Sequence, residues 1–258
     1  MSTHLIAIGN ELLTGEVTDT NSGWLIRELN HIGLKVSRIS IIEDNEVVLK
    51  KLLGDALSEG AKYVLVTGGM GATKDDITKK AISDFFNTDL YLDQEVLDNV
   101  KKVLKLKNKP FLDIMEKQAM VPYGTRIIPN EMGTAPGIIM ETQNTLFAFL
   151  PGVPHEMKHL VKPALLEIIQ KSNVNFTKRK SAIFSKTEIE VSNILETIDF
   201  SEFKMLNIAY LLHEKGVKIN IENTGTNRAE IDRQMQMACT MIATKLKKAF
   251  GGIEVSFK

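Results

Sequence analysis

The chain has almost no cysteine, no excess charge of either sign and no long apolar run. Cys239 is its single cysteine, so no disulfide forms within the chain, and this favours a reducing compartment. The 32 basic and 32 acidic residues cancel, so the overall charge attracts neither nucleic acid nor an anionic membrane. No apolar run approaches the length of a membrane span. We expect a cytoplasmic protein whose partners include neither nucleic acid nor a membrane.

The 258 residues are enough for two domains, and the sequence patterns change near a polar stretch at residues 171–175. Over residues 1–172, short apolar runs alternate with helical patterns, which predicts βαβ units around a mostly parallel sheet. Over residues 173–258, the order of the patterns is βαββαβ, which predicts a second, small α/β domain. The sequence therefore predicts an α/β protein of two domains.

Glycine and proline separate the expected elements. Residues 93–120 are expected to form two helices broken at Pro110, and a helix from Pro154 to Ser172 is expected to kink at Pro163. The second domain is predicted to contain strand 177–185, helix 187–198, strands 206–212 and 217–222, helix 228–249 and strand 253–257. Because right-handed crossovers bring the loops after parallel strands to one edge of a sheet, we expect the ligand site there.

The segment TGGMGATKDDIT, residues 67–78, is a glycine-rich turn between a predicted strand and a predicted helix. It lacks the spacing of a Walker A loop and the third glycine of a dinucleotide-binding fingerprint. Its glycines nevertheless permit the close approach of backbone N–H groups, which favours phosphate. We therefore predict that Gly68, Gly69, Gly71 and Thr73 hold a phosphate group.

Asp75 and Asp76 follow these glycines, and their position has two interpretations. They can cap the next helix, where acids complement the helix dipole. Alternatively, they hold a divalent cation, because two adjacent acids repel a phosphate unless a cation lies between them. The second interpretation predicts a metal ion, held by both aspartates, that clamps a phosphorylated ligand.

Three further loops after predicted strands carry polar residues, glycine and proline: GNELLTGEVTDTN at residues 9–21, NEMGTAPG at residues 130–137 and LPGVPHEM at residues 150–157. Some of these residues can be helix caps or turn formers, and Asp44 at the end of another strand has the same alternative. Taken together, the loops favour a shaped pocket. The candidates for substrate contact are Asn10, Glu11, Asp19, Asn21, Gly133, Thr134, Ala135, Gly137, Pro151 and Gly152.

HEMKH at residues 155–159 matches the HExxH pattern of zinc proteases. Pro154 places His155 in the first turn of the predicted helix, and no convincing third zinc ligand follows. We interpret the pattern as an ordinary helix surface and predict no zinc site.

The four motifs, in this order, resemble the successive signatures of the CinA family (competence/damage-inducible protein A). The first domain also resembles the molybdopterin-binding fold of the MoaB and MogA proteins. The resemblance implies a three-layer α/β/α first domain, a small KH-like second domain and a homodimer. Many CinA proteins carry an additional C-terminal nicotinamide mononucleotide deamidase domain. Since this sequence ends at Lys258, we expect no deamidase activity from it.

The family resemblance implies a metal-dependent ADP-ribose pyrophosphatase, which cleaves ADP-ribose to AMP and ribose 5-phosphate with Mg²⁺, Mn²⁺ or Co²⁺. The functional aspartates of the molybdopterin-handling relatives match Asp44 and Asp76, and Asp75 completes the doubled acid typical of CinA-like chains. We expect Asp44, Asp75 and Asp76 to be catalytic, with Asp44 positioning the metal or the attacking water.

Two other classes of function remain open. One is a non-hydrolytic module that binds molybdopterin or a related nucleotide, as in molybdenum cofactor biosynthesis. The other is a scaffold with a vestigial pocket, whose second domain mediates self-association. Release of AMP from ADP-ribose distinguishes the enzyme from both.

Overall fold

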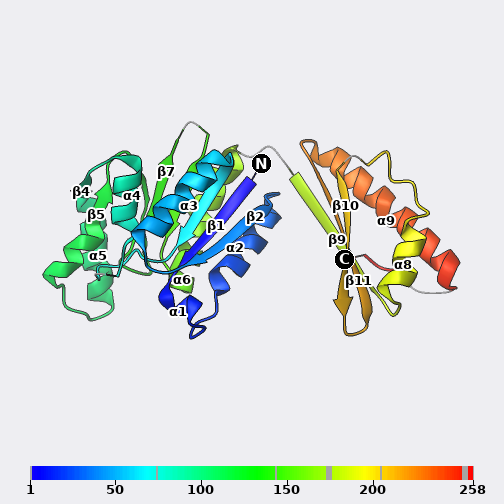
Figure 1. Cartoon of the computed structure of the whole chain (residues 1–258), viewed down its shortest axis with the longest axis horizontal. Helices are drawn as coiled ribbons and strands as arrows, with labels where there is room; N and C mark the ends of the chain where they lie inside the picture. Colours follow the sequence, from blue (N-terminus) through cyan, green and yellow to red (C-terminus); the bar gives the residue numbers. More distant parts are fainter. Residues whose placement is uncertain are drawn as a thin grey trace. The chain divides into compact units, whose positions relative to one another are not determined.

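The protein folds into two compact units, one mainly within residues 1–172 and the other mainly within residues 173–258 (Figure 1). This computed structural model describes residues 2–73, 75–142, 144–172, 176–203, 205–251 and 255–257. The polar boundary expected at residues 171–175 lies partly outside them. Each unit has its own apolar core, so each is described separately.

A six-stranded sheet forms the centre of the first unit, with the strand order β2-β1-β3-β8-β7-β6. The four strands β2, β1, β3 and β8 are parallel, and β7 runs antiparallel to β8 and to β6. The prediction of a mostly parallel sheet is therefore confirmed. The strands are β1 (Ser2–Ile8), β2 (Val36–Ile42), β3 (Ala61–Thr67), β6 (Arg126–Ile128), β7 (Gly137–Glu141) and β8 (Leu146–Leu150).

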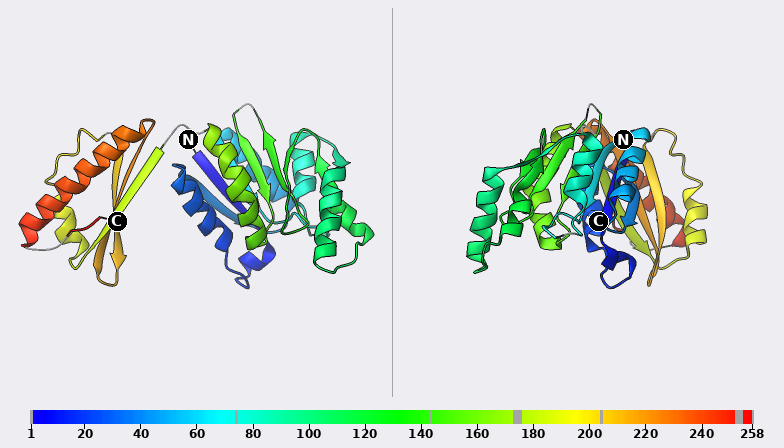
Figure 2. Two further views of the ribbon diagram at one scale, coloured as in Figure 1. Left: turned by 180° about the vertical axis from the view of Figure 1, so that it is seen from behind. Right: turned by 60° about the vertical axis from the view of Figure 1, so that its left-hand side comes forward.

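Helices cover both faces of this sheet, which makes the first unit three-layered (Figure 2). Helices α3 and α4 lie on one face, whereas α2, α6 and α7 lie on the other. Strands β1, β3 and β8 are buried nearly throughout, as expected for a sheet with two covered faces. The helices are α1 (Asn10–Leu13), α2 (Thr20–His31), α3 (Glu46–Ser58), α4 (Thr78–Phe86), α5 (Gln94–Leu106), α6 (Pro154–Leu160) and α7 (Leu166–Ser172).

Two prolines lie at changes in helical structure, although α5 already ends at Leu106, before Pro110. A π-helical turn at Val161–Leu165 separates α6 from α7, and it contains Pro163. Proline has no N–H to donate, so a wider turn accommodates it within a continuous helical path. The second helix expected within residues 93–120 forms after Pro110 as a short 3₁₀ helix, η1 (Asp113–Ala119).

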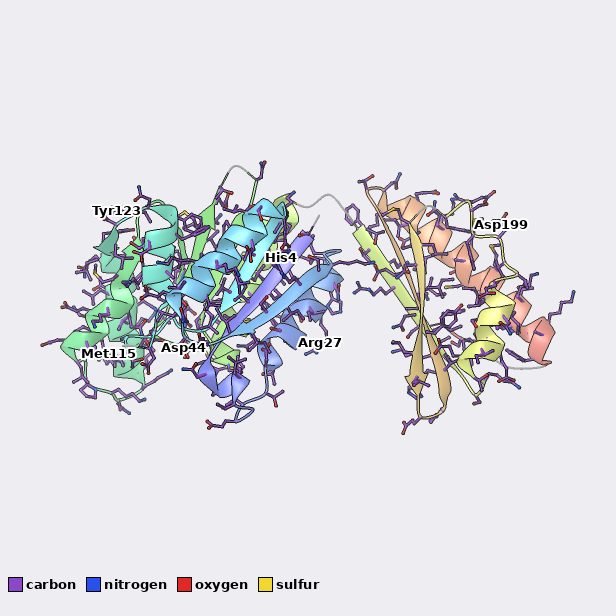
Figure 3. The ribbon with its side chains drawn as sticks, viewed as in Figure 1. His4, Arg27, Asp44, Met115, Tyr123 and Asp199 are labelled. Atoms are coloured by element: carbon purple, nitrogen blue, oxygen red, sulfur yellow. The ribbon has the colours of Figure 1, made fainter. Side chains whose placement is uncertain are left out.

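A small antiparallel pair, β4 (Leu90–Leu92) and β5 (Met120–Pro122), lies beside α5 and η1. Tyr91 and Tyr123 stack at this pair with ring centroids 4.3 Å apart. Figure 3 shows Tyr123 and Met115 at this end of the unit. The pair extends the first unit and brings the end of η1 close to α4, which contacts β5.

The second unit is an antiparallel three-stranded sheet of order β10-β11-β9, packed against two helices. The predicted strand at residues 253–257 is wrong for residues 255–257, because Val255 and Phe257 pack against the core outside the strand ladder. Residues 253 and 254 lie outside the described part. The elements are β9 (Phe176–Phe184), α8 (Glu188–Leu195), β10 (Leu206–His213), β11 (Gly216–Gly225) and α9 (Arg228–Phe250).

No helix in the described part of the chain is long and apolar enough to cross a membrane. The assignment of the second unit as KH-like stays a prediction, as does the cytoplasmic location.

Phe147 is a buried residue of the first core with three aromatic neighbours, and its truncation tests how much this packing contributes to stability. Its ring is fully buried, with centroids 5.1 Å from Phe86 and 6.4 Å from both Phe85 and Phe149. We expect Phe147→Ala to lower the unfolding free energy of the first unit by about 3–5 kcal/mol, because it leaves a cavity among these rings. Urea unfolding followed by circular dichroism measures the loss. The control is Leu106→Ala at an exposed helix end, which should change stability far less.

Candidate functional site

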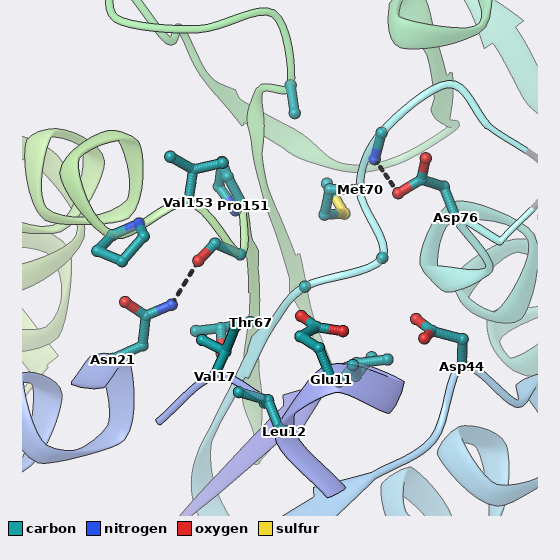
Figure 4. A pocket seen from close by; sticks show the side chains of 18 of the residues that line it. Glu11, Leu12, Val17, Asn21, Asp44, Thr67, Met70, Asp76, Pro151 and Val153 are labelled. Carbon is teal, nitrogen blue, oxygen red and sulfur yellow. Dashed lines mark hydrogen bonds between the residues drawn. The ribbon is translucent and has the colours of Figure 1, made fainter. Parts of the chain in front are cut away.

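A pocket with a volume of about 810 Å³ lies where the parallel strands of the first unit end (Figure 4). The loops after β1, β2, β3 and β8 all contribute to its lining. Parallel strands with crossover connections bring these loops to one edge, as the sequence predicts. We call this cavity the edge pocket.

Most of the predicted site residues line the edge pocket, and three do not. Gly137 is buried in β7, where an added Cβ would lie 3.2 Å from Ile128, so its role is close packing. The role of Thr73 is described below, and Gly133 makes room for the Glu156 carboxylate, because an added Cβ there would lie 1.9 Å from Glu156 Oε2. The predicted residues that line the pocket are Asn10, Glu11, Asp19, Asn21, Asp44, Gly68, Gly69, Gly71, Asp75, Asp76, Thr134, Ala135, Pro151 and Gly152.

The turn after β3 needs glycine for two separate reasons. Gly68 and Gly69 have φ angles of 106° and 61°, which side-chain-bearing residues rarely adopt. An added Cβ at Gly68 would also lie 2.3 Å from the carbonyl oxygen of Ile8. The turn is held by Gly68 N–H, which donates to Leu150 O at 3.0 Å, and by the Thr78 hydroxyl, which donates to Gly68 O at 2.9 Å. The backbone of this loop is therefore fixed against both neighbouring strands.

Asp76 closes the glycine loop on itself. Its Oδ1 accepts from Gly71 N–H at 2.6 Å, and its Oδ2 accepts from the N–H of Thr73 at 2.8 Å and from the Thr73 hydroxyl at 2.7 Å. Helix α4 begins only at Thr78, and no side chain caps it. The helix-capping interpretation of Asp75 and Asp76 is therefore wrong. The carboxylate of Asp76 instead occupies a nest of N–H groups of the kind that binds anions.

Gln118, which the sequence interpretation missed, holds the same loop from η1. It is buried, and with its amide oriented to suit its neighbours it donates to Met70 O at 3.0 Å and accepts from Ala72 N–H at 2.9 Å. The N–H groups of Gly71, Ala72 and Thr73 are thus all paired with protein side chains.

Two N–H groups of the loop remain available to a ligand. Within the described residues, the N–H groups of Gly69 and Met70 have no acceptor. An anion can use these two groups without displacing Asp76 or Gln118. The anion cradle is therefore narrower than the sequence predicts, and it lies nearer the strand end.

Carboxylates dominate the edge pocket. Among the described residues that line it none is Lys, Arg or His, and seven are acidic: Glu11, Glu16, Asp19, Asp44, Asp75, Asp76 and Glu156. Glu11 and Asp44 face one another across the pocket floor (Figure 4). A free phosphate would be repelled here, and the repulsion would be strong because the site is partly shielded from water.

The pKa of Asp44 is raised, in part by the neighbouring acids. Burial raises the pKa of its carboxyl group, and the carboxylates of Glu11, Asp75 and Asp76 raise it further. The backbone N–H of Asn10 opposes the rise by donating to Asp44 Oδ2 at 3.1 Å. The Asn10 side chain returns the contact, since its Oδ1 accepts from Asp44 N–H at 3.4 Å. This reciprocal pair fixes the loop after β1 to the loop after β2.

The donor set fits a hard divalent cation held by one or two carboxylates. Within the described residues, no group of three or more His, Cys, Asp or Glu side chains is arranged to hold a metal ion. Mg²⁺ nevertheless commonly binds through one or two carboxylates together with ligand phosphates and water. Glu11 and Asp44 meet that requirement better than Asp76, whose two oxygens already accept loop N–H groups.

Asp19 and Asn21 organise the pocket wall. Asp19 Oδ1 accepts from Ser22 N–H at 3.0 Å, so it caps the start of α2. Asn21 donates from Nδ2 to Gly152 O at 2.7 Å and ties the loop after β1 to the loop after β8. Within the protein, Asp19 therefore acts as a helix cap, and Asn21 links two loops of the pocket.

Glu156 is another pocket residue that the sequence interpretation missed. It comes from the HEMKH segment, but it lines the edge pocket and accepts from Asn130 Nδ2 at 2.8 Å. His159, from the same segment, lies 3.9 Å from Glu131 instead. The prediction that HEMKH forms no zinc site stays a prediction.

Lys79 lies buried behind the glycine loop. Its Nζ donates to the carbonyls of Gln118 at 2.7 Å and Lys117 at 3.0 Å, which anchors the end of η1 to α4. Burial lowers the pKa of Lys79 to about 7, and the nearby Asp76 carboxylate offsets part of that shift. The buried ammonium thus supports Gln118, which in turn holds the loop.

Comparison with known proteins identifies a family for the first unit, which contains the edge pocket. A sequence model described as "Probable molybdopterin binding domain" matches residues 4–171, which include the edge pocket. The chain belongs to this family.

Individual relatives confirm the resemblance to CinA. A "CinA-like protein" of Flavobacterium psychrophilum is 30% identical over 98% of this chain and 61% of its own length. A "Putative competence-damage inducible protein" of Acetivibrio thermocellus is also 30% identical, over 98% of this chain and 61% of its own length. The crystal structure of CinA from Thermoplasma acidophilum is 31% identical, with a TM-score of 0.59, and covers 65% of this chain and 99% of that one. The chain therefore spans about three fifths of the length of the Flavobacterium and Acetivibrio proteins.

The buried Lys79 predicts a specific dependence of stability on pH. Its pKa is about 7 in the folded protein and 10.5 in an unperturbed chain, so between these values the unfolded state binds more protons. Stability should therefore rise with pH across this window, by up to about 1.4 kcal/mol per pH unit, and be flat below it with respect to this group. Urea unfolding of the parent and of Lys79→Met between pH 7 and pH 10 measures this contribution.

The difference in unfolding free energy between parent and Lys79→Met should grow as the pH rises. Lys102→Met, at an exposed position on α5, should reproduce the parent's pH profile. A constant difference between the parent and Lys79→Met across this range would show that the lysine is not held in the way described.

Proposed function

We propose that the edge pocket binds a phosphorylated pterin or nucleotide, with a phosphate group at the glycine turn after β3. The observation that carries this proposal is the pair of unoccupied N–H groups, Gly69 and Met70, at a fixed glycine turn on the pocket floor. Such groups at a strand end favour phosphate. Membership of the molybdopterin-binding family supports a pterin as the ring of the ligand.

A divalent cation is part of this proposal, because seven acidic residues line the pocket. Glu11 and Asp44 would hold Mg²⁺, Mn²⁺ or Co²⁺. Asp75 also lines the pocket and lies near enough to Asp44 to raise its pKa. A bound cation neutralises charge on a phosphate and stabilises the charge that develops when a phosphate ester or anhydride is cleaved. Asp76 would keep the loop in shape through its three hydrogen bonds.

Hydrolysis of ADP-ribose to AMP and ribose 5-phosphate is the second candidate function. The specific feature that favours it is Asp44, whose pKa is raised and whose carboxylate is held by the Asn10 N–H next to the turn. A carboxylate of raised pKa can accept the proton of a water molecule that attacks phosphorus. Binding without turnover would leave the first function as the complete account.

Binding of pyrophosphate tests whether the pocket needs a cation. By isothermal titration calorimetry, we expect pyrophosphate to bind the parent protein with Mg²⁺ and not with EDTA. Asp44→Asn should weaken the Mg²⁺-dependent binding by about tenfold or more, because it removes one charged oxygen ligand. Glu16→Gln removes an equal charge from the same pocket and serves as the matched control, with little expected effect. Equally tight binding without Mg²⁺ would contradict the role of the cation.

Turnover of ADP-ribose separates the enzyme from the binding module and from a scaffold. We expect AMP, quantified by chromatography, to accumulate with Mg²⁺, Mn²⁺ or Co²⁺. Asp76→Ala should reduce the rate by about a hundredfold, because a loop without its three hydrogen bonds holds the phosphate poorly. Asp98→Ala on α5 controls for loss of an unrelated acid. Saturable ligand binding without AMP would favour the binding module, and self-association without ligand affinity would favour the scaffold.

A further inference from the structure

Thr78, the last residue of the TGGMGATKDDIT segment, contacts the glycine turn at two successive peptide groups. It is fully buried at the start of α4. Its hydroxyl donates to Gly68 O at 2.9 Å, and its backbone N–H donates to Gly69 O at 3.0 Å. One residue therefore holds both of the carbonyl groups that directly precede the Gly69 and Met70 N–H groups.

These two contacts fix the direction of the N–H groups that remain available to a ligand. A trans peptide is planar, and its C=O and N–H point in opposite directions. No peptide bond in the described part of the chain is cis. The carbonyl of Gly68 shares a peptide plane with the N–H of Gly69, and the carbonyl of Gly69 shares one with the N–H of Met70. Because Thr78 holds both carbonyls on the side of α4, both N–H groups point away from α4.

The edge pocket lies on the side of the turn opposite Thr78. Gly68, Gly69 and Met70 line the pocket, whereas Thr78 is not among the described residues that line it. The turn lies close against Thr78, since an added Cβ at Gly69 would lie 2.5 Å from the Thr78 hydroxyl oxygen. Thr78 thus supports the turn from behind, and a ligand would meet it from the pocket.

The rest of the loop is held in a different way. Asp76 and Gln118 bind the N–H groups of Gly71, Ala72 and Thr73 directly, and so withdraw them from a ligand. Contacts through the preceding carbonyls instead orient N–H groups and leave them available. Donors that are oriented before an anion arrives bind it more tightly than donors that must be ordered on binding.

We propose that Thr78 is a positioning residue, which orients the Gly69 and Met70 N–H groups towards the phosphate of the ligand. This inference rests on the proposed function and deepens it, because it assigns the residue that shapes the phosphate subsite. Thr78 acts through the turn and does not touch the ligand, since both of its donors are directed at the carbonyls of the turn.

Binding of pyrophosphate to the full chain tests the role of the Thr78 hydroxyl. Thr78→Val keeps the shape of the side chain but leaves Gly68 O without this donor. With Mg²⁺, calorimetry should show that it weakens binding by about tenfold or more, because the Gly68–Gly69 peptide is no longer held. Thr78→Ser keeps a hydroxyl and should restore the affinity to within about threefold of the parent.

Thr145→Val is the matched control, which separates positioning from a general loss of stability. Thr145 is also buried, and its hydroxyl donates to Ala61 O at 2.7 Å. This contact lies at the ends of β3 and β8 that are remote from the pocket. Both valine variants remove the donor of a buried carbonyl, so both should lower the midpoint of thermal unfolding. Only Thr78→Val should weaken pyrophosphate binding.

Labelling the glycines with ¹⁵N gives a measurement that needs no variant. In the parent protein, saturation with Mg²⁺ and pyrophosphate should shift the amide resonance of Gly69 more than that of Gly71, whose N–H is bound by Asp76. A larger shift at Gly71 than at Gly69 would overturn the inference, whether or not Thr78→Val folds.

The outcomes distinguish this inference from the function it rests on. If the parent does not bind pyrophosphate in Mg²⁺, the proposed function fails and the inference fails with it. If the parent binds and Thr78→Val binds equally tightly, the inference fails and the proposed function stands. The same conclusion follows if Thr145→Val loses as much affinity as Thr78→Val.

Discussion

The structure of the edge pocket depends on one internal anion, the carboxylate of Asp76 inside the glycine loop. Glycine turns are flexible in isolation, and this one is built from residues with positive φ angles. Asp76 fixes it by taking the N–H groups of Gly71 and Thr73, while Gln118 takes that of Ala72. The two N–H groups left over, at Gly69 and Met70, then define where a ligand anion can bind. Asp76 thus occupies part of the loop, so that only the N–H groups of Gly69 and Met70 are left for a ligand among the described residues.

The electrostatics of the pocket follow from this arrangement. Nearly all the charge around the turn is negative, and the one basic group described close behind it, Lys79, is buried against backbone carbonyls. These acids would repel a phosphate unless a cation lay between them, and the proposed function includes a divalent cation for this reason.

Much of this architecture could be predicted from the sequence, because it follows from backbone rules. Apolar runs separated by helical patterns identify a parallel sheet, and a parallel sheet places the loops at residues 9–21 and 67–78 on one edge. The roles of individual polar side chains could not be predicted, because they depend on distant partners. Asp76 reaches back five residues to Gly71, and Gln118 comes from a 3₁₀ helix with no motif. Glu156 lies within a pattern that resembles a zinc site, and the pattern does not predict its contact with Asn130 or its place in the edge pocket.

Three strand ends meet in this protein without any side chain between them. Gly152 lies so close to Gly68 that an added Cβ would be 3.3 Å from the Gly68 Cα, and Gly68 itself leaves no space beside the backbone of Ile8. A side chain at Gly68 would therefore push the ends of β1 and β3 apart, whereas one at Gly152 would require its neighbour to move by a few tenths of an ångström. Substitutions that alter the ligand but keep this backbone junction are therefore restricted to other residues that line the pocket.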